Sequence, residues 1–235
     1  MTVNLSKLEF TDWIQAISLS VFLVAGLLVA SPGVVALIAV MAFFGLIPAR
    51  FRIVVTATLI GAFLLNGLVG NALFPAFVAR YPSLPEWAAS ARLAGLIEPV
   101  TTKFLPAGFL LWYFHNHSPD TVDFLRRNSW RSGALLGFSF GLMEALLKVV
   151  KPTGVYGDVS SVTVTIFIAT WLHLFTGFLV AGAVFQWWGR DPDPSYRQWI
   201  FLGVKIGIPL TIAMGVHYFW NAGGRILIYE PLGFA

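Results

Sequence analysis

The chain has 235 residues, of which 57% are hydrophobic and only 11% are charged, and its mean hydropathy is +0.79. Soluble globular domains carry about 25% charged residues, so this composition excludes that class. The lack of cysteine excludes disulfides, thiolate metal ligands and a cysteine nucleophile, which leaves carboxylates, imidazoles and hydroxyls for any chemistry. The net charge of +4 comes from basic residues scattered over short loops, so we expect no nucleic-acid partner.

Seven segments are long and apolar enough to cross a bilayer, which takes about 20 mostly apolar residues. Glu9 and Asp12 precede the first of them, so we interpret it as a span and not as a signal peptide. We therefore predict an all-α fold, a polytopic transmembrane helix bundle of about seven spans (six to eight) that forms a single integral membrane domain over residues 1–235. The expected spans are residues 14–30, 33–47, 53–74, 93–114, 133–150, 162–188 and 200–220.

The connections between these spans set the predicted topology. Pro32-Gly33 and Pro48 indicate tight turns. Longer connections are expected over residues 75–91, 115–132, 151–161 and 189–199. The side of the amino terminus carries more basic residues, and the positive-inside rule therefore places the amino terminus in the cytoplasm. The basic residues on that side are Lys7, Arg50, Arg52, Arg126, Arg127, Arg131, Arg190 and Arg197.

The fourth expected span contains an unusual group of polar residues. Glu98 is followed by Pro99, two threonines and Lys103 within an otherwise apolar run. An ionisable group in a membrane costs several kcal/mol unless it is used or paired, so Glu98 is a candidate functional residue. The structural alternative is a direct Glu98 to Lys103 ion pair, but a separation of five residues is a poor spacing for contact on one helix face.

The fifth expected span combines a glycine stripe with a carboxylate. Gly133, Gly137 and Gly141 recur every four residues, a pattern that lets another helix approach closely. Glu144 lies near Gly141 on the same side of the helix, so we expect it to face the bundle. Lys148 follows Glu144 by four residues and offers a purely structural partner for it.

The last two spans each carry an imidazole. His173 precedes a run of small residues, and a buried histidine that bonds to a neighbouring helix is a common structural feature. In the last span, His217 and Asn221 are four residues apart, which places them on one helix face where both could bind one ligand oxygen.

Depth along the helices relates these residues to one another. With a rise of about 1.5 Å per residue, Glu98 and Glu144 each lie roughly 8 to 10 Å inside their spans, in the outer half of the bilayer. His217 and Asn221 fall at the same level, and His173 falls near the middle of the membrane. We therefore expect a polar site toward the outer half.

Residues 93–221 resemble the PrsW-type intramembrane proteases, a family within the superfamily of CAAX-processing and bacteriocin-processing glutamic-type membrane proteases. The first motif of that family, EExxK or EExxxR, is similar to the run from Glu98 to Lys103. Pro99 stands in place of the second glutamate, and the spacing to Lys103 follows the CAAX-type pattern. The next motif, a Gly-rich stretch with Phe-x-x-x-Glu, is similar to Phe140 and Glu144.

The later motifs of the family also have counterparts in the same order. A helix with His, Thr and Gly is similar to His173, Thr176 and Gly177, and His-x-x-x-Asn is similar to His217 and Asn221. The resemblance implies hydrolysis of a peptide bond in or next to a membrane, within a prokaryotic plasma membrane, without a cofactor. The substrate would be a membrane-anchored protein or peptide that meets the enzyme in the lipid bilayer.

The resemblance also implies roles for individual residues. Glu98 and Glu144 would activate water and transfer protons, with His173 assisting or orienting them. His217 and Asn221 would bind the developing oxyanion. Lys103, Phe140 and Thr176 would support the site.

Three alternatives remain open from the sequence. A zinc metalloprotease could use Glu98, Glu144, His173 and His217 as metal ligands. A non-catalytic membrane scaffold of the same superfamily is favoured by Pro99. An ion or proton carrier ranks lowest, because Lys205 is among the few polar groups in the inner half.

Overall fold

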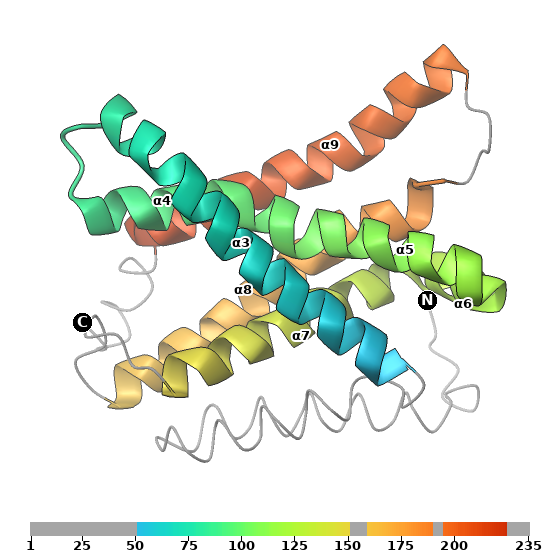
Figure 1. Cartoon of the computed structure of the whole chain (residues 1–235), viewed down its shortest axis with the longest axis horizontal. Coiled ribbons are helices and arrows are strands. Elements are labelled where there is room, and N and C mark those ends of the chain that lie inside the picture. The colour runs from blue at the N-terminus through green and yellow to red at the C-terminus, as the bar shows by residue number, and fades with distance from the viewer. Residues whose placement is uncertain (1–50, 151–158, 190–194, 225–235) are drawn as a thin grey trace, which may run out of the picture.

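The computed structural model describes residues 51–150, 159–189 and 195–224, and these ranges contain helices and no strand (Figure 1). The all-α prediction is therefore confirmed for this part of the chain. Three of its helical segments are long and apolar enough to cross a membrane: Arg52–Arg80, Ala169–Trp187 and Tyr196–Ala222. This agrees with an integral membrane protein. The expected spans 14–30 and 33–47 lie outside the described residues, so the total of about seven stays a prediction.

The first described hairpin differs from the expected boundaries. Helix α3 (Arg52–Arg80) runs through Pro75, and α4 (Glu86–Pro99) follows after a connection of residues 81–85. The predicted connection over 75–91 is therefore wrong at both ends. A proline removes one backbone hydrogen bond from a helix, and the apolar residues on both sides of Pro75 keep α3 helical.

Helix α4 continues without a break into a π-helical segment, η3 (Val100–Phe104), and then into α5 (Leu105–His117). Pro99 directly precedes η3, and Pro106 is the second residue of α5, one position after Leu105. Each proline lacks an amide hydrogen, and its ring crowds the carbonyl one turn earlier. A π turn relieves this crowding by inserting one extra residue into the helix, a feature that often occurs at functional sites.

A short helix, α6 (Pro119–Arg127), lies within the expected connection 115–132, where the sequence analysis predicted no element. Ser118 and Pro119 form an ordinary helix start. Arg126 fixes the helix in place, because its Nη2 donates to the carbonyl oxygen of Gly189 at 2.6 Å, just beyond the end of α8 (Val159–Trp187). This part of the chain is therefore a helix packed against the bundle and not a loop.

Helices α7 (Ser129–Val150) and α8 lie side by side as the most extensively packed pair of the described residues (Figure 1). A Cβ atom added at Gly137 would lie 2.7 Å from Cα of Gly177, and one added at Gly141 would lie 2.9 Å from Cα of Thr170. No real side chain fits at such distances. The predicted close-packing role of the glycine stripe is thus confirmed.

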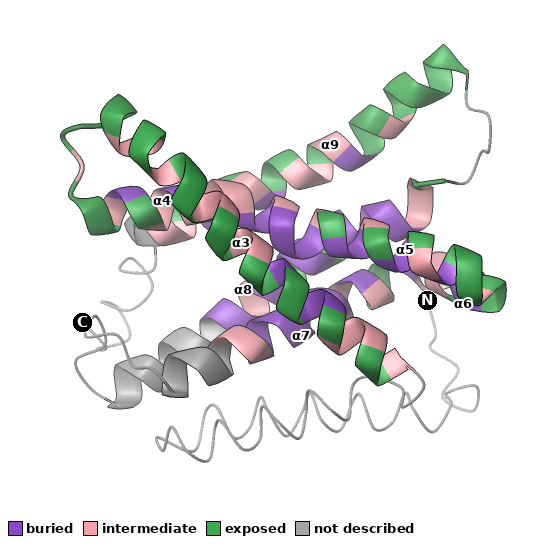
Figure 2. Cartoon of the chain, viewed as in Figure 1, coloured by how far each residue is buried: buried purple, intermediate pink, exposed green. Residues whose placement is uncertain are grey.

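The buried residues lie mainly where α5, α7 and α8 meet, whereas α3 and α9 (Tyr196–Phe219) present exposed apolar faces (Figure 2). Leu64 and Leu68 on α3, and Phe201 on α9, are more than half exposed. Apolar faces of this kind suit contact with lipid. Helix α9 continues into a second π segment, η4 (Trp220–Gly224). The main buried side chains are Ala107, Leu110, Leu111, Phe114, Leu136, Phe138, Phe140, Leu142, Val184 and Phe185.

Candidate functional site

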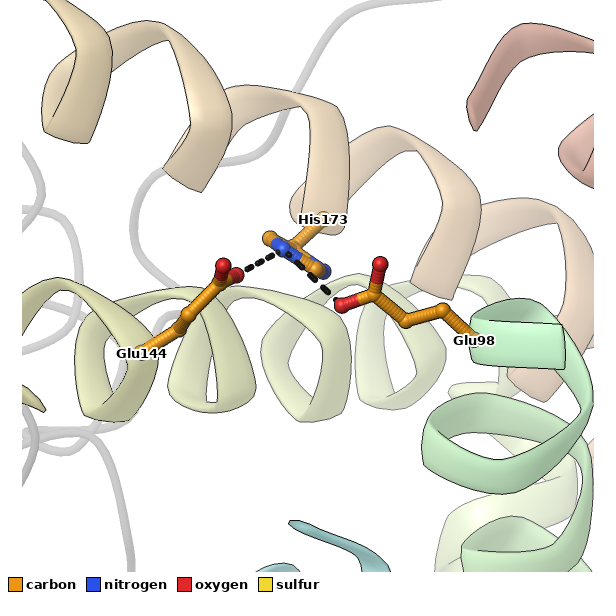
Figure 3. Close-up of side chains that lie close together, drawn as sticks. All are labelled: Glu98, Glu144 and His173. Carbon is orange, nitrogen blue, oxygen red and sulfur yellow. Dashed lines mark hydrogen bonds and ion pairs between the residues drawn. The ribbon is translucent and has the colours of Figure 1, made fainter. Parts of the chain in front are cut away.

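His173 stands between two carboxylates that come from two other helices. Its Nε2 lies 2.5 Å from Oε2 of Glu144 on α7 and 3.7 Å from Oε1 of Glu98 on α4 (Figure 3). His173 is buried, as is Glu98, whereas Glu144 is half-buried. Three of the residues that the sequence singled out therefore meet at one nitrogen atom.

His217 on α9 completes the contacts of Glu98. Its Nδ1 lies 3.3 Å from Oε2 of Glu98, and its Nε2 lies 3.2 Å from Oγ1 of Thr176 on α8. The His217 ring is buried, and its centroid is 5.1 Å from that of His173. Both oxygens of Glu98 thus face an imidazole, and both ring nitrogens of His217 have a partner.

Lys103 reaches the opposite edge of the His173 ring. Its Nζ lies 2.6 Å from Nδ1 of His173 and 2.7 Å from Oγ1 of Thr102, and it stands 4.8 Å from the centroid of the Phe140 ring. The side chain is fully buried. No direct ion pair joins Glu98 to Lys103 among the described residues, so the structural alternative of such a pair does not hold; the lysine contacts His173.

The π segment η3 explains how Glu98 and Lys103 serve one site. The backbone amide of Leu105 bonds to the carbonyl of Val100, five residues earlier. Residues five positions apart therefore come closer to a common face than they do on an α-helix. The spacing of five counted against a direct Glu98 to Lys103 pair, and the widened turn instead lets Lys103 contact His173 beside Glu98.

Two close helix approaches set the position of the carboxylates. The glycine stripe of α7 brings Glu144 to the level of His173 on α8. On the other side, a Cβ atom added at Gly95 of α4 would lie 2.7 Å from Cα of Tyr218 on α9. Gly95 therefore allows α4 and α9 to pack with Glu98 beside His217.

The hydroxyl groups determine where protons lie around His217. Thr176 has one hydroxyl hydrogen, and its Oγ1 lies 2.9 Å from the carbonyl oxygen of Leu172, to which it donates. With its hydrogen on that carbonyl, Thr176 accepts from Nε2–H of His217; in the other tautomer Thr176 donates to Nε2, and the proton of a neutral His217 lies on Nδ1, facing Glu98. Because Nδ1 of His217 faces a carboxylate oxygen of Glu98, lone pairs would repel there unless a proton lies between them. Glu98 and His217 therefore share one proton.

The positions of these protons also determine the charge of the whole cluster. The ammonium of Lys103 balances the carboxylate of Glu144, and the pair of Glu98 and His217 is neutral with its shared proton. A buried group of ionisable residues is stable only if its charges are compensated in this way. With Thr176 as the acceptor, the site would hold one ionised carboxylate and one available proton without a net charge.

Asn221 takes a less central place than the sequence predicted. It is half-buried, and its carboxamide makes no hydrogen bond to another described residue. The π segment η4 begins at Trp220, between His217 and Asn221. The side chain of Lys148, the alternative partner of Glu144, lies outside the described side chains.

The expected separation in depth between His173 and the two glutamates is bridged by their side chains. The His173 ring contacts both glutamates.

The two threonines that follow Pro99, together with Asn66, which the sequence pattern did not single out, support the site. Thr101 on η3 donates to Oδ1 of Asn66 on α3 at 2.7 Å, and Thr102 donates to the backbone carbonyl of Glu98 at 2.7 Å. Asn66 is a polar residue inside an expected span, so the criterion that selected Glu98 could have found it. Nothing in the sequence pattern indicated that Gly95 is a helix contact.

Comparison with known proteins brings no identification. No family model, no curated protein and no solved structure matches the chain.

The cluster can be tested as a metal site from its donor atoms. One ligand atom each of Glu98, Glu144 and His173 lies within 4.8 Å of the others, and His217, the fourth ligand of the zinc alternative, is outside this group. A metal would need the lone pair of His173 Nε2. Because the ammonium of Lys103 holds the lone pair of Nδ1, a neutral His173 ring carries its proton on Nε2. The donor set therefore fits a metal only in part.

Proposed function

We propose that this protein is an intramembrane endopeptidase of the PrsW type, which hydrolyses a peptide bond in or next to the membrane with water activated by glutamate. The observation that carries the proposal is the position of Glu98 and Glu144 on either side of His173 Nε2, at 3.7 and 2.5 Å. Two carboxylates in unlike environments around one imidazole are suited to general acid and base work. The order of the motifs, similar to that of the PrsW-type proteases, supports the same reaction.

Glu144 is the better placed general base. Its side chain is 22% exposed against 11% for Glu98, so it is the more accessible to water. Glu144 is also ionised when Lys103 carries the balancing positive charge. Glu144 takes a proton from water while the water oxygen attacks the carbonyl carbon of the scissile bond. His173, which donates to Glu144, orients the carboxylate.

Glu98 and His217 are suited to the second half of the reaction. When the tetrahedral intermediate collapses, the carbon–nitrogen bond breaks and the departing nitrogen needs a proton. The proton shared by Glu98 and His217 supplies it, and the proton taken up by Glu144 restores the starting state. The two carboxylates thus have different roles because one is ionised and the other shares a proton.

Asn221 is the donor best suited to the oxyanion. Both ring nitrogens of His217 are engaged, one by Glu98 and one by Thr176. The carboxamide of Asn221 is half-buried near the same end of α9 and can donate to an oxygen atom of the substrate. His217 then contributes to the oxyanion site indirectly. Its contacts with Glu98 and Thr176 fix the end of α9 that carries Asn221, and it shares a proton with Glu98.

The proposal includes the setting of the enzyme. It is a bundle of about seven spans in a prokaryotic plasma membrane, with the amino terminus in the cytoplasm and the site toward the outer half. The exposed apolar faces of α3 and α9 support a lipid environment. The substrate is a membrane-anchored protein or peptide, because only such a chain reaches a site buried among these helices.

Two alternatives have an observation in their favour. The group of Glu98, Glu144 and His173 favours a zinc metalloprotease that uses the same residues. Pro99, which is buried at the start of η3 where the family motif has its second glutamate, favours a non-catalytic scaffold. The absence of cleavage in the experiment below would support the scaffold.

Cleavage of single-span substrates tests the proposal. The purified chain in lipid nanodiscs is incubated with a panel of fluorogenic single-span peptides, and the rate of wild type is compared with those of Glu98→Gln, Glu144→Gln and His217→Ala. Loss of a general acid or base lowers the rate by about 100-fold to 10,000-fold. The exposed Glu86 on α4 and His115 on α5 provide matched controls, Glu86→Gln and His115→Ala. Equal cleavage by wild type and all variants would refute the catalytic roles of Glu98, Glu144 and His217.

A further inference from the structure

The Nδ1 atom of His173 faces Nζ of Lys103 at 2.6 Å. An ammonium group has three hydrogens and no lone pair, so in this contact it can only donate. The ring nitrogen must then accept, and a neutral imidazole carries its single proton on the other nitrogen, Nε2. The lysine therefore favours the tautomer in which Nε2 presents the N–H group, the same nitrogen that faces Glu144.

The surroundings of Lys103 are those of an ammonium and not of a neutral amine. The single hydroxyl hydrogen of Thr102 is directed to the backbone carbonyl of Glu98 at 2.7 Å, so Oγ1 of Thr102 accepts from Nζ. The face of the Phe140 ring, 4.8 Å away, attracts a cation. All three directions of the ammonium thus have a partner, and the carboxylates beyond His173 compensate its charge.

We propose that Lys103 is a positioning residue that holds His173 in the tautomer with its proton on Nε2 and so keeps a metal ion from that nitrogen. The proposal deepens the proposed function and rests on it for its catalytic consequence. The Nε2–H group, which lies between Glu144 and Glu98, is available to orient a carboxylate. A metal would need the lone pair that this proton occupies.

The tautomer can be read directly in the wild-type protein. The chain is labelled with ¹⁵N-histidine, reconstituted in nanodiscs and measured by nitrogen NMR at neutral pH. The His173→Gln variant assigns the His173 signals by their disappearance. We expect Nδ1 at the shift of an unprotonated nitrogen and Nε2 at the shift of a protonated one. Any proton on Nδ1, in the other tautomer or in an imidazolium, would overturn the proposal.

Two substitutions separate the tautomer from a merely structural role of the lysine. Lys103→Met keeps an unbranched apolar stem but has no donor, whereas Lys103→Arg keeps a cationic donor. We expect Lys103→Met to release His173 into a mixture of tautomers and Lys103→Arg to restore the wild-type signals. A folded Lys103→Met protein with the wild-type tautomer would contradict the proposal. If this variant does not fold, the wild-type spectrum still decides.

Zinc binding provides an independent readout. Wild type, Lys103→Met and the double variant Lys103→Met/His173→Gln are equilibrated with zinc chloride, and the bound metal is counted per chain. We expect Lys103→Met to bind zinc at least about tenfold more tightly than wild type, and the double variant to lose that gain. Equal zinc affinity in wild type and Lys103→Met would refute the metal-excluding role.

These measurements separate the present inference from the proposed function. The nitrogen shifts and the zinc affinity need no turnover, so a protein that cleaves no substrate still reports the His173 tautomer. If the protein cleaves its substrate but His173 carries its proton on Nδ1, the proposed function stands and the role proposed for Lys103 is refuted.

Discussion

Oε2 of Glu98 and Nδ1 of His217 lie 3.3 Å apart, across the contact between α4 and α9. The other nitrogen of His217 lies 3.2 Å from Oγ1 of Thr176, and a proton between Nδ1 and Glu98 avoids repulsion of their lone pairs. This relationship distinguishes Glu98 from Glu144, which accepts from His173. The two carboxylates thus face different imidazoles, and the proposed mechanism gives them different protonation states.

Removing the acceptor of His217 should impair the reaction without removing any ionisable group. Thr176→Val keeps the shape of the side chain but leaves Nε2–H of His217 without its partner in a buried place. The lost hydrogen bond is worth about 1 kcal/mol or somewhat more, so we expect a decrease of about tenfold in kcat/KM. Thr211 on α9, an exposed residue bonded to the carbonyl of Gly207, gives the control Thr211→Val. Equal losses in both variants would refute the role of Thr176.

An ester substrate should distinguish the general acid from the general base. An alkoxide leaves without protonation far more readily than an amine, so a variant that lacks the acid gains most from an ester. For an amide substrate, Glu98→Gln should be much slower than wild type. When an ester replaces the scissile amide, we expect this ratio of wild-type rate to variant rate to fall by at least about tenfold. Glu144→Gln, which lacks the base in attack, should gain little. The reverse order would exchange the two roles.

The glycines of α7 should resist even a methyl group. In Gly137→Ala the new Cβ would lie 2.7 Å from Cα of Gly177, and α7 would have to move away from α8. Overpacking of this kind costs about 1 to 3 kcal/mol in the free energy of unfolding. Gly207 on α9 has no atom within 4 Å of such a Cβ, so Gly207→Ala is the matched control. Thermal unfolding in nanodiscs, followed by circular dichroism, should show a lower midpoint for the first variant only.

Metal removal should leave the activity unchanged. Because Lys103 holds the lone pair of His173 Nδ1, we expect wild type to contain less than one zinc ion per chain after purification. Treatment with a chelator should then not alter the rate of substrate cleavage. Stoichiometric zinc, lost together with activity on chelation and restored with it, would establish the metalloprotease instead.

Much of the candidate site was predictable because burying polar groups in apolar surroundings is costly. Glu98, Glu144, His173 and His217 were singled out by that cost alone, and the structure brings all four together. The glycine stripe of α7 was equally visible, because small residues at a spacing of four form a continuous strip on any α-helix. Hydropathy and periodicity are local properties that need no knowledge of neighbouring helices.

Other features depend on the packing of helices. The expected α-helical register failed after Pro99, where η3 inserts an extra residue and Lys103 reaches the site. Helix α6 was predicted as a loop, because a nine-residue helix with charged residues depends on its contact with the end of α8.

The sequence by itself determined the helical class, the apolar segments and the polar residues that need partners. Only the tertiary structure decided which partner each one has. Lys103 bonds to His173 and not to Glu98, and Glu98 meets His217 because Gly95 lets α4 and α9 approach. The physical reason is that the cost of burying a charge acts on each residue separately, whereas the contacts that offset it require several helices to cross at one place.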